Sequence, residues 1–147
     1  MIKLSNNFNA ITKIIKNCEI KIDILKKTER LISKKEDEVY SYTYLLNATI
    51  KAKDSNKFLP VENITINKMD DKKNPETELD VEETGIRLDF SLEESMLMSI
   101  LSDAGFYQKY LEKDKWARNM VKGWSDTEVF PRLIKMKNYY NFVTEVL

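Results

Sequence analysis

The sequence contains no histidine and a single cysteine, Cys18. Catalytic arrangements that use an imidazole base are therefore excluded, as are Cys/His zinc sites and disulfides within the chain. Glycine and proline are scarce, with three of each, and isolated glycines cannot form a Gly-rich phosphate loop. We read Cys18 as a small buried hydrophobe in a reducing compartment. We therefore expect no enzyme activity, no cofactor and no metal site.

Long apolar runs are also missing. No window approaches the ~18 consecutive apolar residues of a membrane span, and no apolar stretch follows the N-terminus as in a signal peptide. We therefore expect a cytoplasmic protein. Abundant Asn, Lys and Ile suggest an AT-rich genome, such as that of a low-GC bacterium or its phage.

The charges balance overall but are segregated along the chain. There are 24 basic and 24 acidic residues, yet residues 1–57 carry +5, residues 58–104 carry −8 and residues 105–147 carry +3. One interpretation is that the acidic middle packs beside the basic ends, within one molecule or across a dimer. The other is that the middle meets a basic partner, or that the basic ends meet nucleic acid.

The first 59 residues have neither glycine nor proline and show a heptad-like seam. Its apolar residues recur at steps of three and four: Phe8, Ile11, Ile15, Cys18, Ile22 and Leu25. This spacing predicts a long helix over residues 1–57. A continuous helix from Ser5 to about Lys53 would be roughly 70 Å long, whereas a compact domain of this size is about 40 Å across. We therefore expect either a helical hairpin hinged near residues 33–38 or a coiled coil with a partner chain.

Residues 39–50 are ambiguous. Tyr40, Tyr42 and Tyr44 alternate with small residues, as in a half-buried strand. The helical spacing is kept, however, by Val39, Thr43, Leu46 and Ile50. We interpret the segment as helix.

The middle of the chain predicts a small β-hairpin. Residues 61–67 and 86–90 alternate in character, and the polar segment between them is acidic. Its carboxylate pairs, Asp70-Asp71 and Glu82-Glu83, are expected to keep ordinary pKa values and to act as surface charge.

The C-terminal third predicts three helices. Ser91 with Glu94 and Ser125 with Glu128 match capping boxes, and Gly105 and Gly123 mark helix ends. The expected fold is thus mainly α. It has an N-terminal helical segment (1–57), an acidic β-hairpin region (58–90) and a C-terminal helical bundle (91–147), folding as one domain.

The function that the sequence favours is a non-enzymatic interaction or assembly protein, an adaptor or an inhibitor. It would dock a protein partner, or a second copy, through helical and acidic surfaces. The candidate contact residues are Ile15, Ile22, Leu25, Asp70, Asp71, Glu82 and Glu83.

The alternative is a single-stranded nucleic-acid-binding accessory protein. Of the 15 aromatic residues, nine lie between residues 106 and 142, where they are interleaved with Lys and Arg. Bases stack on such rings while phosphates meet the cations. The candidate residues are Lys109, Lys113, Lys115, Trp116, Arg118, Lys122 and Tyr139, with Trp116 and Tyr139 expected to be exposed. The competing interpretation is a helical core whose rings pack inward.

Overall fold

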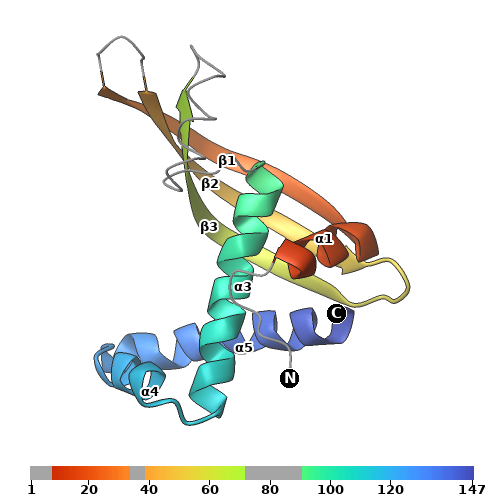
Figure 1. Cartoon of the computed structure of the whole chain (residues 1–147), viewed down its shortest axis with the longest axis vertical. Coiled ribbons are helices and arrows are strands. Elements are labelled where there is room, and N and C mark those ends of the chain that lie inside the picture. Colours follow the sequence, from red (N-terminus) through yellow and green to blue (C-terminus); the bar gives the residue numbers. More distant parts are fainter. Residues whose placement is uncertain (1–7, 34–38, 72–90) are drawn as a thin grey trace. The chain divides into compact units, whose positions relative to one another are not determined.

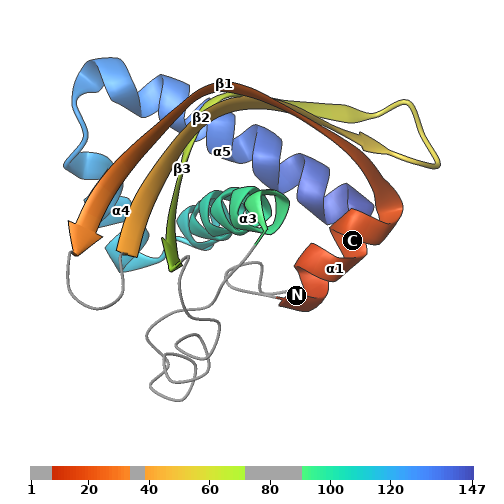
Figure 2. The same cartoon turned by 90° about the horizontal axis from the view of Figure 1, so that it is seen from above.

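The computed structural model describes residues 8–33, 39–71 and 91–147 (Figure 1). The elements, in chain order, are α1 (Phe8–Asn17), β1 (Cys18–Ser33), β2 (Val39–Ala52), β3 (Phe58–Asp71), α3 (Leu92–Leu111), α4 (Lys115–Lys122) and α5 (Asp126–Val146). The three strands form one antiparallel sheet in which β2 lies between β1 and β3 (Figure 2). None of the described helices is long and apolar enough to cross a membrane.

The prediction of a mainly helical fold with a long N-terminal helix is wrong. Among the described residues before position 52, only those of α1 are helical, and the others belong to β1 and β2. The physical reason is visible in β1, where apolar Cys18, Ile20 and Ile22 alternate with polar residues at the period of a strand. The alternating Tyr40, Tyr42 and Tyr44 likewise lie in β2. The coiled-coil prediction fails with the helix.

The chain divides into two compact units. The first comprises residues 1–20, 49–60 and 96–147, and the second comprises residues 21–48 and 61–95. All three strands contribute residues to both units.

The second unit holds most of the sheet. On β2, the buried residues Tyr42, Leu46 and Ala48 are an even number of positions apart, so they lie on one face of the strand together with half-buried Tyr44. Along that strand the rings of Tyr40, Tyr42 and Tyr44 follow one another at centroid distances of 6.3 and 6.4 Å. The ammonium of Lys27 on β1 lies over two of them, 4.8 Å from the Tyr42 centroid. By contrast, residues 23–30 of β1, an edge strand, are exposed.

The alternation of β3 is interrupted once. Val61 and Ile64 are both buried, and the two residues between them are exposed. Asn63 has a φ of 52°, a left-handed conformation that asparagine tolerates better than most residues. The extra residue is a β-bulge, a common feature of edge strands. The strand predicted over 61–67 is confirmed, and its predicted partner at 86–90 lies outside the described residues.

The first unit is built around α3 and α5. The buried residues of α3 recur at helical spacing: Met96, Leu97, Ile100, Leu101 and Ala104. Those of α5 are Tyr139, Phe142 and Val143. Helix α1 contacts α5 and buries Ala10, Ile11 and Ile14. The apolar stripe of α1 is thus rotated from the predicted seam, which placed Ile15 rather than Ile14 in the core.

The three C-terminal helices are present, but their bounds differ from the prediction. Helix α3 continues through Gly105, which is buried inside it, because the apolar spacing of its core face continues past that residue. Helix α3 ends at Leu111, and α4 begins at Lys115. The N-cap of α4 is Asp114, whose Oδ1 accepts a 3.0 Å hydrogen bond from the Ala117 N–H. Gly123 ends α4 as predicted.

Only one of the two predicted capping serines uses its hydroxyl as a cap. The Ser91 Oγ accepts a 3.1 Å hydrogen bond from the Glu94 N–H. At the start of α5 the Ser125 side chain makes no cap hydrogen bond and instead lies 3.2 Å from the Thr127 hydroxyl. The predicted capping box at Ser125 is therefore wrong in this respect.

Candidate functional site

Aromatic rings and cations alternate in the first unit where α3, α4 and α5 meet. The ring of Phe106 on α3 contacts Trp116 edge-on, with centroids 5.5 Å apart, and stacks on Trp124 at 5.8 Å. Each indole also carries a cation. Lys109 Nζ lies 5.4 Å from the Trp116 centroid, and Arg132 Cζ lies 4.8 Å from that of Trp124. We call these five residues the tryptophan cluster.

A second group of rings lies on the same helices. Tyr107 contacts both Tyr110, at 6.3 Å, and Tyr140 of α5, at 5.6 Å. The guanidinium of Arg118 lies 5.1 Å from the Tyr110 centroid. All three tyrosines are half-buried, so they pack α3 against its neighbours. This group fits the expectation of a helical core with inward-packed rings.

Trp116 differs from the other rings because it is largely exposed. Its side chain is 55% exposed, and Met120, one turn further along α4, is 45% exposed. Residues four apart lie on the same side of a helix, and Ala117, about 100° around the axis from Trp116, is fully buried, so this exposed side borders the buried one. Trp116 and Met120 therefore form a continuous apolar edge on α4, which we call the α4 ridge.

The structure brings together only some of the residues predicted to bind nucleic acid. Lys109 and Trp116 are in contact, and Arg118 lies on Tyr110. The predicted exposure of Tyr139 is wrong, because its side chain is only 2% exposed and faces the core from α5. The other predicted cations are exposed on α4 or just before it: Lys113, Lys115 and Lys122.

The residues predicted to bind a protein partner do not form one stripe. Ile15 is on α1 and is 37% exposed, whereas Ile22 and Leu25 are on β1. Asp70 and Asp71 end β3. The side chains of those two aspartates, and all of Glu82 and Glu83, lie outside the described residues, so the acidic surface stays a prediction.

Half-buried Asp103 of α3 and buried Tyr139 of α5 form a polar pair that the sequence did not predict. Burial raises the pKa of Asp103, and nearby Lys135 and Arg132 offset this only in part. Burial, with a smaller contribution from the Asp103 charge, raises the pKa of Tyr139 to about 12. The signal was available, because Asp103 borders the core face of α3, next to Ile100 around the helix axis. The pair has the character of a packed core polar group rather than of a reactive one.

Among the described residues, Cys18 also has a pKa that is shifted by its surroundings. It is buried, and burial raises the pKa of its thiol, with Lys53 opposing the shift weakly. A thiol with a raised pKa holds little of the reactive thiolate near neutral pH. Cys18 is thus suited to packing rather than to nucleophilic chemistry.

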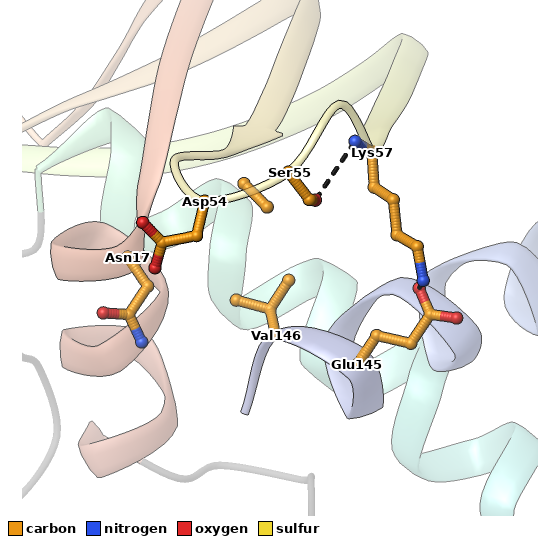
Figure 3. A pocket seen from close by; sticks show the side chains of 7 residues that line it. Asn17, Asp54, Ser55, Lys57, Glu145 and Val146 are labelled. Atoms are coloured by element: carbon orange, nitrogen blue, oxygen red, sulfur yellow. Dashed lines mark hydrogen bonds and ion pairs between the residues drawn. The ribbon is translucent and has the colours of Figure 1, made fainter.

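A polar pocket of about 270 Å³ lies where the C-terminal ends of α1 and α5 meet the β2–β3 turn (Figure 3). In the turn, the Ser55 hydroxyl accepts a 3.2 Å hydrogen bond from the Lys57 N–H, and the Lys57 ammonium pairs with Glu145 at 3.0 Å. Asn17 and Asp54 line the opposite side. All of these side chains are exposed, so the pocket is an open surface feature without a buried reactive group.

Among the residues that the structure describes, no group of three or more acidic, cysteine or histidine side chains is placed to hold a metal ion. Comparison with known proteins found no matching protein family, no matching curated protein and no matching solved structure. Functional inference therefore depends on the surfaces described above.

Proposed function

We propose that this chain is a non-enzymatic interaction protein, an adaptor or an inhibitor, that docks a protein partner on the α4 ridge. The observation that carries the proposal is the distribution of exposed apolar side chains. Of the nine large apolar residues exposed in the described part of the chain, Trp116 and Met120 lie one turn apart on the same side of α4. Clustered exposed apolar side chains favour partner binding, whereas single ones are ordinary.

The composition of the ridge favours a protein over a nucleic acid. A protein partner can bury both the indole of Trp116 and the thioether of Met120, whereas bases gain chiefly from the ring. Tryptophan is also among the residues that most often dominate the binding energy of an interface. The surrounding positive charge of residues 105–147 would suit a partner surface that is acidic around an apolar centre. We also propose a cytoplasmic protein of phage or low-GC bacterial origin, because Cys18 is the single cysteine and Asn, Lys and Ile are abundant.

A capture experiment with matched variants tests the proposal. The full chain is immobilised and exposed to extract from cells that naturally make it, beside Trp116→Ala, Met120→Ala and the control Glu112→Ala. Glu112 is exposed just before α4 but does not belong to the ridge. We expect a defined protein that the wild type and Glu112→Ala bind equally, and that each ridge variant binds about tenfold more weakly. Equal binding by all four chains, or no defined partner, would contradict the proposal; circular dichroism verifies that each variant is folded.

Single-stranded nucleic acid is the second candidate, and one observation favours it. Trp116 presents an exposed ring with Lys109 over it, which is the pairing of stacking platform and cation that such proteins use. The test is a tryptophan fluorescence titration with a single-stranded oligonucleotide over a series of salt concentrations. Affinity that rises steeply as salt falls, and that Trp116→Leu abolishes, would support it. Absence of binding at low salt would eliminate it.

A further inference from the structure

The solvent-facing side of α5 carries a stripe that differs from the rest of the helix. At 3.6 residues per turn, Asp126, Phe130, Ile134 and Lys137 fall within about 80° of one another around the axis. The buried Tyr139 and Val143 lie on the opposite side. Phe130 is 72% exposed, the most of any large apolar side chain in the described residues, and Ile134 is 40% exposed. We call these four residues the α5 stripe.

The two charges of the stripe stand apart from the other charges of the helix. Arg132 pairs with Glu128 at 3.7 Å and lies on Trp124, and Lys135 lies over Tyr139. Glu145 pairs with Lys57. Asp126 and Lys137 make no ion pair with any described residue. Their charges are therefore available to a molecule outside the chain.

The order of the stripe makes it complementary to itself. Reading along α5, an acid is followed by two apolar residues and then a base. When two copies of the helix run antiparallel, Asp126 of each copy lies opposite Lys137 of the other, and Phe130 lies opposite Ile134. The midpoints of these two pairings differ by half a residue, which is under ~1 Å along the helix. A parallel pairing would instead place like charges opposite each other.

We propose that a second copy of this chain packs antiparallel on the α5 stripe, with the two-fold axis beside residue 132. A self-complementary patch of this kind is what a two-fold dimer interface requires. The apolar centre is two side chains per copy, less than the roughly 20–30 residues a side of a standard stable interface. The dimer is therefore concentration-dependent rather than permanent. This inference is independent of the α4 ridge, so either can fail without the other.

Sedimentation velocity of the full chain over a micromolar to millimolar range tests the dimer. We expect the mass to rise from the 17.3 kDa of one chain toward twice that value. Phe130→Asp should keep the chain monomeric throughout. Because Phe130 is mostly exposed, that variant should retain the circular dichroism of the wild type. A monomer at every concentration, or an unchanged dimer in Phe130→Asp, would overturn the proposal.

Charge reversal gives a sharper second arm at low salt. Asp126→Lys alone and Lys137→Asp alone each create two like-charge oppositions and should weaken the dimer about tenfold. The double variant Asp126→Lys/Lys137→Asp restores opposite charges and should recover the wild-type affinity. An equimolar mixture of the two single variants should form a heterodimer for the same reason. Lys113→Asp is the control off the helix; failure of the double variant to recover would overturn the antiparallel register.

Discussion

The backbone N–H of Asn63 on β3 donates a 2.8 Å hydrogen bond to Oδ1 of Asn47 on β2. Asn63 is the residue with a φ of 52°, at the bulge that interrupts the alternation of β3. A bulge leaves one residue outside the regular ladder, so its N–H needs another acceptor. The Asn47 side chain supplies that acceptor and thereby fixes where the register of β3 changes.

Replacing Asn47 with alanine should therefore destabilise the sheet. The Asn63 N–H would lose its acceptor, which we expect to lower the free energy of unfolding by about 1 kcal/mol. Asn47→Asp retains an acceptor oxygen of the same reach and should lose less. Urea unfolding of the three chains measures the difference. Equal stability of Asn47→Ala and the wild type would show that the hydrogen bond does not hold the bulge.

The two C-terminal caps should respond differently to alanine. Asp114→Ala removes the acceptor of the Ala117 N–H and should cost about 1 kcal/mol. Ser125→Ala should cost much less, because the Ser125 side chain makes no cap hydrogen bond. Asp114→Asn keeps the acceptor and serves as the control. Comparable losses for Asp114→Ala and Ser125→Ala in urea unfolding would contradict the assigned caps.

Gly123→Ala should stabilise the chain, although glycine ends α4. Gly123 has a φ of −78°, which any L-residue adopts, and an added Cβ would lie 3.4 Å from the Met120 carbonyl oxygen. Alanine lowers the conformational entropy of the unfolded chain. We therefore expect the free energy of unfolding to rise by roughly 0.4–1 kcal/mol. Thermal unfolding measures it. A loss of stability would mean that the end of α4 needs the left-handed freedom of glycine.

Asp103 should make stability depend on pH. Because burial raises its pKa, the folded chain binds this proton more tightly than the unfolded chain does. The resulting stability is fully present below the unfolded pKa, near 3.8, and is lost as the pH rises through the raised folded pKa. The side chain of Asp103→Asn stays neutral at every pH. The free energy of unfolding of this variant, relative to that of the wild type, should therefore increase from pH 4 to pH 7.

The same variant has a spectroscopic readout. The Asp103 charge contributes to the pKa of Tyr139, which is raised to about 12. In a titration followed by tyrosinate absorbance, Asp103→Asn should therefore lower the pKa of the step that belongs to Tyr139. Tyr139→Phe should remove that step. A titration unchanged by Asp103→Asn would show that the two groups do not interact.

The C-terminal third was largely predictable because its signals are local. The Ser91 cap, the Gly123 end and the number of helices follow from residues a few positions apart. Continuation of α3 through Gly105 was missed because burial of the helix face outweighs the cost of one glycine, about 1 kcal/mol.

The N-terminal part was mispredicted because two periods coincide there. Selecting Cys18, Ile22 and Leu25 gives steps of four and three, but this omits Ile20 and Ile24, which complete an alternation with Glu19, Lys21 and Asp23. That alternation and the β-branched side chains are typical of a strand. The pairing of β1 with β2 then outweighs any helical preference, which is a long-range effect that spacing alone does not reveal.

The α4 ridge could be anticipated only in part. Trp116 was expected to be exposed, and it is, whereas Tyr139 was expected to be exposed and is buried. Both are aromatic residues among lysines, so composition does not separate them. Their burial depends on which side of each helix faces α3, and only the tertiary structure determines that.

Photo-crosslinking from the first unit tests docking on the α4 ridge most directly. A photoreactive amino acid is placed in turn at Trp116 and Met120, and at the exposed control positions Glu112 and Asp54, in cells that naturally make the protein. We expect one defined protein adduct, formed strongly from positions 116 and 120 and weakly from 112 and 54. Equal adducts from all four positions, or stronger ones from the controls, would contradict docking on the α4 ridge.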